Sequence, residues 1–565
     1  MARRPADPVT AYARAVTKRR GSRGRVVAGE LVRLASRRHL DDLARRKAMG
    51  WVWDEAAVAR VIEFFSTFLW LVEVDRPFVL TPWQQFVVGS LFGWKLADGS
   101  RRFRLAYIEV GKGNGKTPMA AGVGLYGLTS DQETSAEVYS AATTREQANI
   151  LFSDAVKMVK HSEELQELVE QNANNLSVAS TFSFFRPLSS EHRGLDGRRV
   201  HMALIDEVHE HPTPLVVDKM RAGTKGRRQS LIFEITNSGY DQQSVCFHHH
   251  EYSEKILRGA LVNESWFAYV CQLDEGDRWS DPKVWIKANP NLGTSIPARY
   301  LQDQVDEALG MPSKQNIVRR LNFCEWTSVE TLWIDLARWQ AGQHARTAEH
   351  LAALTARPCW VGVDLSSKID LSAVVLVFPP SAGEARWQLL VHLFMPAENL
   401  DERGDRDRAP YREWAEQGLI ELTPGNRIDQ DRIRDRVVAL KAEGYQIQQI
   451  GIDPWNAANL AEHWAQDGFE VVEVPQTMNQ MSEPSKMFEA FTAESEIDAG
   501  ANPAMQWMVS NAVVVRDTKD NLYPTKKQSR GRIDGLIAAI IGIKLAQGLD
   551  GGGASQAFEE RGLWA

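Results

Sequence analysis

Apolar residues in the first half of the chain form short continuous runs that are separated by helical stripes. Runs at 103–108, 136–142, 200–205 and 230–235 have the length and the apolar content of buried strands. Between these runs, apolar residues recur at helical spacing, most clearly over 144–160. Strands that alternate with helices predict an α/β domain with a parallel sheet and helices on both of its faces.

The residues that precede this sheet also predict helices. Residues 1–25 begin as a flexible stretch and gain helical potential from Ala11 onward, and we expect helices over 27–48 and 54–73. The second of these helices carries an apolar stripe that we expect to be core: Val58, Val61, Ile62, Phe65, Phe68 and Leu69.

The order of the elements changes in the second half of the chain. Runs at 360–364, 373–378 and 387–394 are consecutive strands at hairpin spacing. A helix at 429–443 and a further strand at 447–453 follow them. Hairpin strands followed by a helical connection predict a mixed sheet.

Length and this change of pattern predict two large domains. A chain of 565 residues is too long for one ordinary hydrophobic core. The break between the two patterns lies near 356–358. We expect a basic arm or helix at 1–50, a first domain at 51–325, a linker at 326–356, a second domain at 357–548 and a flexible tail at 549–565.

Composition places the chain among soluble globular proteins. Hydrophobic residues make up 44% and charged residues 25% of the sequence. No apolar run approaches the roughly 20 residues of a membrane span, and the N-terminus lacks the apolar segment of a secretory signal. The cysteines, which form no C-x-x-C pair, argue for a reducing compartment and against a structural zinc site: Cys246, Cys271, Cys324 and Cys359.

Positive charge gathers at the N-terminus although the whole chain has a net charge of −7. Residues 3–47 are rich in Arg and Lys and hold few acids. Such a cluster can neutralise DNA phosphates, and a solvated or partly disordered arm is the alternative. For the triplet His248-His249-His250 we expect a solvated surface rather than a metal site, because no nearby carboxylate spacing completes a ligand set.

A glycine-rich turn with the sequence EVGKGNGKT lies between the first strand and a helical pattern. Glycines let backbone N–H groups turn inward around phosphates, Lys116 can reach the β- and γ-phosphates, and the Thr117 hydroxyl can bind Mg²⁺. The strict P-loop pattern fails at Val110, where its first glycine belongs, so a plain glycine turn is the alternative. The loop residues that would surround the phosphates are Gly111, Lys112, Gly113, Asn114, Gly115, Lys116 and Thr117.

Polar residues at the ends of neighbouring elements complete this candidate site. Asp206 and Glu207 follow a buried strand, where the first acid can hold the water shell of Mg²⁺ and the second can polarise the attacking water. A helix cap is the alternative for these acids. Thr236 and Asn237 follow the next strand and could sense the γ-phosphate. Gln84 lies on a helix that Thr81 and Pro82 can begin, and its amide can recognise adenine.

Three aspartates stand at the ends of elements in the second domain. Asp364 is in the first strand, Asp453 ends the fourth, and Asp534 begins a late apolar helix. Hard oxygen ligands suit Mg²⁺ or Mn²⁺, and two ions about 4 Å apart would activate water and stabilise the leaving oxygen. A turn acid and a helix cap are the alternatives. Lys526 and Lys527 could contact the scissile strand, although surface lysines are the commoner explanation.

With both halves in place, residues 75–545 resemble the large terminase subunit of tailed bacteriophages, the ATP-driven motor and nuclease of genome packaging. The family's P-loop departs from the strict pattern and carries a basic residue early in the loop, which Lys112 matches. The motifs that carry the resemblance are Thr81–Gln84, Gly111–Thr117, Leu204–His209, Gly362–Ser366 and Ile533–Gly535.

The resemblance implies a RecA-like (ASCE) P-loop ATPase domain followed by an RNase H-like nuclease domain with a mixed sheet. It also implies an arginine that completes a neighbouring subunit's ATP site, for which Arg193 is the first candidate and Arg198 the second. The remaining implied roles are adenine contact by Gln84, phosphate and Mg²⁺ binding by Lys116 and Thr117, a metal-site acid at Asp206, a catalytic base at Glu207, coupling at Thr236 and Asn237, and nuclease ligands at Asp364, Asp453 and Asp534.

The expected function is therefore a viral DNA-packaging motor. ATP hydrolysis would drive double-stranded DNA into the procapsid, and a two-metal endonuclease would cut concatemeric DNA, with Mg²⁺ as cofactor and Mn²⁺ possible at the nuclease site. The family implies a small terminase subunit and the portal protein as partners, a ring of five copies, and the host cytoplasm as location. Two alternatives stay open: a DEAD-like helicase or translocase, suggested by Asp206–His209, and a stand-alone RNase H-like nuclease with a structural ATP site.

Overall fold

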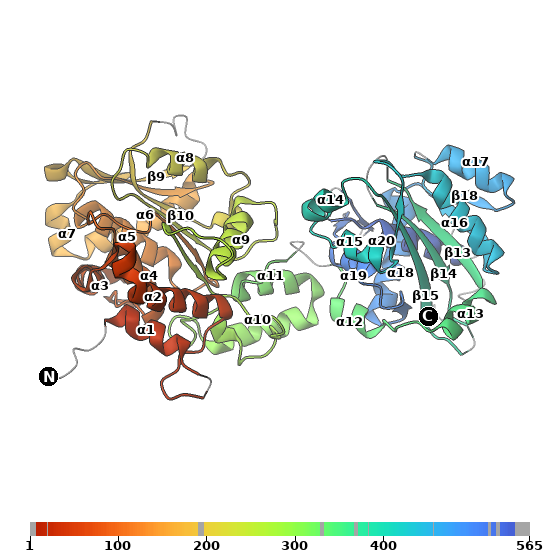
Figure 1. Ribbon diagram of the computed structural model, residues 1–565, viewed down its shortest axis with the longest axis horizontal. Helices are drawn as coiled ribbons and strands as arrows, with labels where there is room; N and C mark the ends of the chain where they lie inside the picture. The colour runs from red at the N-terminus through yellow and green to blue at the C-terminus, as the bar shows by residue number, and fades with distance from the viewer. Residues whose placement is uncertain are drawn as a thin grey trace. The chain divides into compact units, whose positions relative to one another are not determined.

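The chain, described here as a computed structural model, is built around two separate β-sheets (Figure 1). One unit holds residues 1–310 and 317–327, and the other holds residues 311–316 and those from 328 onward. None of the helices among the described residues is long and apolar enough to cross a membrane. The structure describes residues 7–19, 21–189, 197–327, 333–366, 371–381, 383–455, 457–517, 521–526 and 531–548.

The first unit contains an eight-stranded sheet whose central strands are parallel and buried on both faces. Parallel pairing runs without interruption from β12 to β9, whereas β8 and β7 pair antiparallel at one edge. This arrangement confirms the parallel sheet predicted from the alternating pattern. In spatial order the strands are β12 (Trp266–Val270), β5 (Leu105–Glu109), β11 (Leu231–Thr236), β10 (Val200–Asp206), β6 (Glu137–Ala142), β9 (Ser183–Ser189), β8 (Asn175–Val178) and β7 (Glu170–Asn172).

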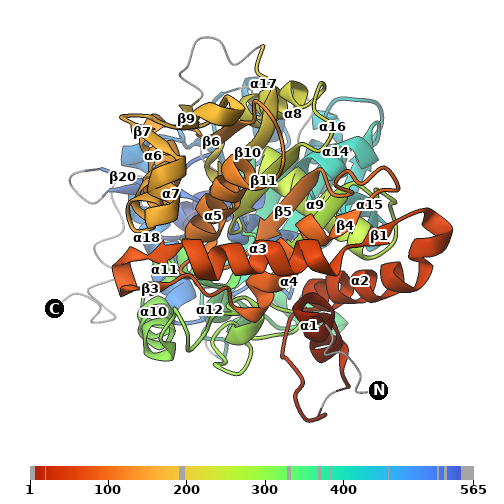
Figure 2. The same cartoon turned by 90° about the vertical axis from the view of Figure 1, so that its left-hand side faces the viewer.

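Helices pack on this sheet through apolar faces. The helix α5 contacts β6, β10 and β11, and α9 contacts β5 and β12. The helix α3 packs along α4 (Figure 2). The helices of this unit are α1 (Pro8–Thr17), α2 (Glu30–Met49), α3 (Glu55–Phe68), α4 (Pro82–Gly93), α5 (Lys116–Thr129), α6 (Arg145–Lys160), α7 (Glu163–Leu168), α8 (Leu215–Gly223), α9 (Val245–Leu257) and α10 (Ala298–Gly310), while α11 (Pro312–Phe323) is divided between the units.

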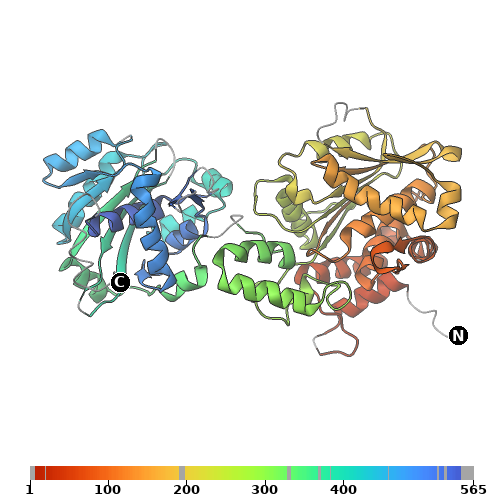
Figure 3. The same ribbon diagram turned by 180° about the vertical axis from the view of Figure 1, so that it is seen from behind.

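Short elements complete the first unit. Residues after β12 bury an apolar cluster of their own, which includes Trp285, Leu301 and Phe323. The helices α10 and α11, drawn in green in Figure 3, supply part of that cluster. The remaining short strands and 3₁₀ turns are β1 (Val52–Trp53) with β4 (Trp94–Lys95), β2 (Trp70–Leu71) with β3 (Arg76–Pro77), η1 (Val72–Val74), η2 (Ala179–Thr181), η3 (Val208–Glu210) and η4 (Trp285–Lys287).

The basic N-terminal segment folds onto this unit. The Asp7 side chain caps α1 by accepting a hydrogen bond from the backbone N–H of Thr10 at 2.9 Å, so the helix begins before the predicted Ala11. Its Val9 and Val16 side chains are completely buried. The helix packs against α4, and α2 packs against α9 and β12. Residues from 8 onward therefore contribute to the core rather than only to a charged surface.

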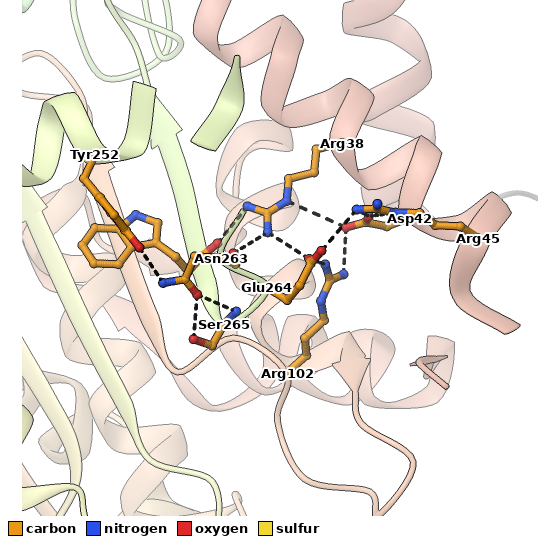
Figure 4. A network of polar contacts seen from close by, with 9 residues as sticks. Arg38, Asp42, Arg45, Arg102, Tyr252, Asn263, Glu264 and Ser265 are labelled. Carbon is orange, nitrogen blue, oxygen red and sulfur yellow. Dashed lines mark hydrogen bonds and ion pairs between the residues drawn. The ribbon is translucent and has the colours of Figure 1, made fainter. Parts of the chain in front are cut away.

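A network of ion pairs holds α2 in place (Figure 4). The buried guanidinium of Arg102 lies 2.7 Å from Asp42 and 2.6 Å from Glu264. From α2, Arg38 donates to the backbone carbonyls of Trp266 and Asn263, and Arg45 donates to Asp42. Part of the basic cluster therefore neutralises acids within the protein, and that part is not available to DNA phosphates.

The second unit contains a seven-stranded mixed sheet. The strands β13, β14 and β15 pair antiparallel as predicted from their hairpin spacing, and β17 then pairs parallel with β13. A separate hairpin joins β20 (Val514–Arg516) to β21 (Leu522–Pro524). The sheet strands are β16 (Ile420–Thr423), β15 (Trp387–Pro396), β14 (Ser372–Phe378), β13 (Pro358–Asp364), β17 (Gln446–Ile452) and β18 (Val471–Glu473) in spatial order, with β19 (Ile497–Asp498) beside β15.

The helix α20 (Asp534–Ala546) lies directly on β13 and β14. A Cβ atom at Gly362 would stand 1.8 Å from the Ala538 carbonyl oxygen, so only glycine permits this approach. The close contact fixes the start of α20 relative to the end of β13. The other helices of the unit are α12 (Leu336–Ala341), α13 (Ala348–Thr355), α14 (Leu400–Asp407), α15 (Tyr411–Glu416), α16 (Gln430–Ala442), α17 (Ala458–Gln466), α18 (Met478–Ala493) and α19 (Pro503–Ser510).

Candidate active sites

The glycine-rich turn connects β5 to α5, as the sequence predicts. Gly113 and Gly115 have φ values of 84° and 76°, a left-handed conformation that favours glycine. At Gly111 the limit is space, because a Cβ atom would stand 2.6 Å from Asn289 Oδ1. The backbone therefore requires glycine at each of these positions.

Lys116 is the first residue of α5, and its side chain folds back over the turn. Its buried ammonium donates to the carbonyl oxygen of Val110 at 2.9 Å and lies 3.5 Å from Asn237 Oδ1. Asn237 directly follows β11, which pairs with β5. The geometry therefore places a positive charge within the loop and next to the end of the neighbouring strand.

Thr117 and Asp206 meet across the end of the sheet. The Thr117 hydroxyl donates to Asp206 Oδ2 at 3.0 Å, and Asp206 is the last residue of β10. Burial and the adjacent carboxylate of Glu207 raise the pKa of Asp206. For Glu207, burial is outweighed by the Lys116 ammonium and by His209, so its pKa is lowered. Of the two neighbouring acids, Glu207 is therefore the stronger acid and Asp206 the weaker one.

His209 links this acid pair to the end of β11, a role that the sequence analysis missed. Its Nδ1 lies 3.2 Å from Glu207 Oε2, and its Nε2 lies 2.9 Å from Glu210 Oε1. Its backbone N–H donates to Thr236 Oγ1 at 3.2 Å. Burial lowers the pKa of His209, but the two carboxylates more than compensate and raise it. The sequence Asp206–His209 contained a signal for this contact, because His209 follows Glu207 by only two positions.

Glu207 itself has a strained backbone. Its φ of 48° is left-handed, which costs a residue other than glycine about 1–3 kcal/mol. Oε2 of Glu207 is buried and faces His209 Nδ1 at 3.2 Å. An ionised carboxylate has several acceptor positions, so Glu207 can also accept a hydrogen bond from water, as a catalytic base must.

Gln84 contacts the P-loop through its amide. Its Nε2 donates to the Gly115 carbonyl oxygen at 3.3 Å, and its Oε1 accepts hydrogen bonds from the backbone and hydroxyl of Thr81 in a capping box. Gln84 is 2% exposed, so the side chain supports the loop from α4. Its contact with adenine stays a prediction.

Two asparagines from the segment after β12 hold the P-loop, and the sequence analysis assigned them no role. Asn114 Nδ2 donates to Asn289 Oδ1 at 3.0 Å, and Asn114 Oδ1 accepts from the backbone N–H of Asn291 at 3.0 Å. Asn291 Nδ2 donates back to the Asn114 carbonyl oxygen at 2.9 Å, and its Oδ1 accepts from the Trp83 indole at 2.9 Å. We call Asn289 and Asn291 the asparagine clamp.

The backbone of the loop is held by the same region of the chain. The N–H of Gly111 donates to the Ala288 carbonyl oxygen at 3.2 Å, and the N–H of Lys112 donates to that of Leu321 at 2.7 Å. The N–H of Val110 donates to the Thr236 carbonyl oxygen at 3.0 Å. The start of the loop, where the first glycine is missing, is therefore fixed by protein contacts.

Neither of the two candidate trans-acting arginines is placed near the P-loop by the structure. Arg193 lies outside the described residues. Arg198 precedes β10, and its guanidinium lies 5.6 Å from the centre of the Tyr139 ring. Because the P-loop lies at the opposite end of the parallel strands, Arg198 has no part in the ATP site of its own chain.

The histidine triplet is not a solvated surface, and this expectation was wrong for two of its residues. His249 Nδ1 lies 2.7 Å from Glu234 Oε2, and His250 Nδ1 lies 2.9 Å from Glu109 Oε2. Both histidines are largely buried, whereas His248 is exposed. The carboxylates come from β11 and β5, so no local spacing in the sequence could indicate the pairing.

In the second unit, the structure brings two of the predicted acids together around a lysine. Asp364 ends β13 and Asp534 begins α20, and both are almost completely buried. Lys526 Nζ lies 2.6 Å from Asp364 Oδ2 and 2.7 Å from Asp534 Oδ1. Gln476 Nε2 donates to the other oxygen of Asp364 at 2.9 Å. Lys527 lies outside the described residues.

The third predicted acid is placed by strand register. Val363 pairs with Ile452 in the parallel β13–β17 ladder, so Asp364 and Asp453 are the next residues of neighbouring strands. Neighbouring strands lie about 5 Å apart. The Asp453 side chain accepts a hydrogen bond from the backbone N–H of Trp455 at 3.0 Å. The three acids therefore lie at one end of the sheet, as the order of the elements indicates.

The donor set at this edge fits a divalent cation. Oδ2 of Asp534 is buried and accepts no hydrogen bond among the described residues, and carboxylate oxygens are the ligands that hard cations prefer. Burial and the Asp534 carboxylate raise the pKa of Asp364 against the opposing effect of Lys526. In the described part of the chain, no three acidic, histidine or cysteine side chains lie close enough together to coordinate one metal ion. The Lys526 ammonium neutralises the two buried acids.

Two family models together match most of the chain. The model of the terminase large subunit ATPase domain matches residues 82–255, and that of the terminase large subunit endonuclease domain matches residues 260–548. The large terminase subunit of Enterobacteria phage HK97 is 26% identical over 505 residues, which cover 86% of this chain and 95% of that protein.

A further protein and a solved structure are also similar to this chain. The protein YmfN of Escherichia coli K12 is 28% identical over 356 residues, which cover 62% of this chain and 78% of YmfN. The crystal structure of the HK97 large terminase superposes with a TM-score of 0.43 at 25% identity, covering 86% of this chain and 99% of that one.

Proposed function

This chain belongs to the terminase large subunit family, and we propose which of its residues carry the two activities of that family. It is the ATP-hydrolysing and DNA-cutting subunit of a viral DNA-packaging motor, with an ATPase domain and an endonuclease domain. It uses a nucleotide and divalent metal ions and works with DNA and the packaging machinery. The helicase and stand-alone nuclease alternatives are not favoured, because both domains of the family are present.

In the ATPase domain, the P-loop would bind the phosphates of ATP with Lys116 against the β- and γ-phosphates. Thr117 and Asp206 would hold Mg²⁺, which supplies charge compensation for the phosphates when it is bound. The observation that supports this assignment is the 3.0 Å hydrogen bond between the Thr117 hydroxyl and Asp206, which joins the P-loop to the acid.

Glu207 would accept the proton of the attacking water, because its lowered pKa keeps it ionised and a carboxylate has acceptor positions beyond the contact with His209. Thr236 and Asn237 would report the state of the γ-phosphate. Asn237 touches Lys116, and Thr236 binds the backbone of His209. Asn237 would therefore sense the phosphates through Lys116, and Thr236 is connected through His209 to the proposed base, Glu207.

In the nuclease domain, Asp364, Asp453 and Asp534 would hold divalent ions, Mg²⁺ or Mn²⁺, which supply an activated water and stabilise the leaving oxygen when bound. Lys526 occupies the space between two of these acids with a positive charge. Lys526 would then be available to contact a DNA phosphate when divalent ions supply the positive charge at these acids.

The finer assignments concern partners. We infer that the small terminase subunit selects the DNA, that the portal of the procapsid is the docking site, and that the large subunit works as a homomeric ring of about five copies in the host cytoplasm, as the family implies. In such a ring, Arg193 or Arg198 would complete the ATP site of the adjacent copy.

One pair of assays tests the proposed function. ATP turnover and plasmid cleavage are measured on the wild-type chain with and without double-stranded DNA and Mg²⁺. We expect ATP turnover that DNA stimulates and cleavage that requires the metal. ATP turnover without any cleavage in either metal, Mg²⁺ or Mn²⁺, would contradict the nuclease assignment.

A further inference from the structure

Trp455 stands out among the tryptophans of this chain. Its side chain is 80% exposed, whereas the other tryptophans that the structure describes are buried or partly buried. A single exposed apolar residue is ordinary on a protein surface. The position of Trp455 is what distinguishes it.

Trp455 is attached directly to the proposed metal site. Its backbone N–H donates to Asp453 Oδ1 at 3.0 Å, and Pro454 between them restricts the backbone. Asp453 in turn is the neighbour of Asp364 across the β13–β17 ladder. The backbone of Trp455 is therefore held beside Asp453, and an exposed indole projects from that position.

An extended substrate bound at Asp453 lies close to the exposed indole, which is two residues further along the chain. A duplex that places its scissile phosphate on the acids brings deoxyribose and base edges next to that phosphate. The flat apolar face of an indole binds these groups by stacking or by packing, and it does so without regard to base sequence. A protein partner on the same indole would cover the acids that DNA has to reach, which favours DNA as the occupant.

We propose that Trp455 is a DNA-contacting residue of the nuclease domain, and that its indole packs against sugar or an unstacked base beside the scissile phosphate. The proposal rests on the assignment of Asp364, Asp453 and Asp534 as the nuclease ligands. Trp455 then contributes to the binding of DNA and leaves the chemical step to the acids.

The test compares Trp455→Ala and Trp455→Phe with the wild-type chain. A matched control is Phe182→Ala, which removes an aromatic ring that is 78% exposed in the other unit. Binding of a labelled linear duplex is measured in EDTA, where no cleavage occurs. Cleavage of plasmid is then measured with Mn²⁺ over a range of DNA concentrations, and urea unfolding reports that each variant is folded.

We expect Trp455→Ala to raise the Kd and the KM for DNA about tenfold, as for the loss of one base–aromatic contact. The value of kcat should change by less than about twofold, because the reacting groups are untouched. Trp455→Phe should recover part of the affinity, Phe182→Ala should match the wild type, and DNA should quench the wild-type fluorescence more than that of Trp455→Phe.

Three outcomes would overturn the proposal. The first is an unchanged Kd and KM for DNA in Trp455→Ala. The second is a loss of kcat at unchanged KM, which would show that Trp455 only positions Asp453. The third is a change that is confined to the association of copies of the chain. Failure of the nuclease assignment is a separate result. In that case the wild-type chain cleaves no better than Asp364→Asn, while the binding comparison in EDTA still decides whether Trp455 contacts DNA.

Discussion

The hydroxyl of Thr117 in the P-loop donates a hydrogen bond to the carboxylate of Asp206, 3.0 Å away at the end of β10. These residues are 89 positions apart in the sequence. The contact brings together a hydroxyl and a carboxylate oxygen of the proposed nucleotide–metal site. This hydrogen bond is the main structural observation behind the proposed ATPase site.

Replacement of Thr117 tests this pair. Thr117→Val keeps the shape and removes the hydroxyl, so we expect ATP turnover to need about 10- to 100-fold more Mg²⁺. Thr117→Ser keeps the hydroxyl and should stay close to the wild type. The measurement is the ATPase rate as a function of Mg²⁺ concentration, and equal Mg²⁺ dependence in all three proteins would remove Thr117 from the metal site.

The asparagine clamp predicts a defect in nucleotide binding. Asn291→Ala leaves the Trp83 indole N–H and the Asn114 carbonyl without partners, which costs about 1–3 kcal/mol for each buried group. Because Asn114 lies within the P-loop, we expect the KM for ATP to rise about tenfold, the effect of about 1.4 kcal/mol.

The matched control for the clamp is Asn263→Ala, which removes an asparagine of the same unit that bonds Tyr252 and Ser265 instead of the P-loop (Figure 4). Its KM should equal that of the wild type. If Asn291→Ala lowers stability and leaves the KM for ATP unchanged, the clamp is structural support without an effect on the nucleotide.

Asp42 carries the ion-pair network of α2. Asp42→Asn leaves the buried guanidinium of Arg102 without its closest charge partner on α2, and we expect the loss of about 3–5 kcal/mol in the free energy of unfolding. Glu30→Gln is the control, because its carboxylate pairs with Arg258 at the surface and should contribute at most about 1 kcal/mol. Urea unfolding measures both, and equal losses would mean that burial of Arg102 is not the source of the effect.

His39 predicts a pH dependence of stability. Its Nδ1 accepts from the Trp94 indole at 3.1 Å, so its Nε2 carries the proton and donates to Thr10 Oγ1 at 3.1 Å. Burial lowers the pKa of His39 from 6.5 to about 4. The unfolded chain binds the proton more readily than the folded chain. The contribution of neutral His39 to the free energy of unfolding is therefore complete above pH 6.5 and is lost as the pH falls towards 4.

The variant His39→Gln can form both hydrogen bonds without titrating. Between pH 6.5 and 4, the free energy of unfolding of the wild type should therefore fall more steeply than that of the variant, by up to about 1.4 kcal/mol per pH unit. Urea unfolding at several pH values provides the comparison. Parallel curves for the two proteins would mean that His39 is not buried as a neutral ring.

Much of the fold could be predicted because its signals are local. The runs at 103–108 and 200–205 are continuous and apolar since their strands are buried on both faces of a parallel sheet. The acids at Asp206 and Asp364 mark the ends of such strands, where side chains of neighbouring elements converge. The position of each acid at the end of a strand was enough to assign it to its candidate site.

The residues that sequence reasoning missed depend on partners far along the chain. Asn291 reaches Asn114 across 177 positions, and His250 reaches Glu109 across 141. The periodicity of a sequence does not show which distant residue a polar side chain will contact. The basic N-terminal cluster was equally ambiguous, because arginine serves both a DNA surface and an internal ion pair, and only the position of Asp42 distinguishes the two.

The most direct test of the account is whether the two activities separate in one chain. ATP turnover and Mn²⁺-dependent plasmid cleavage are measured side by side on Glu207→Gln and Asp364→Asn. The account predicts that the first variant loses ATP turnover and keeps cleavage, and that the second does the reverse. Loss of both activities in either folded variant, or full cleavage by Asp364→Asn, would contradict it.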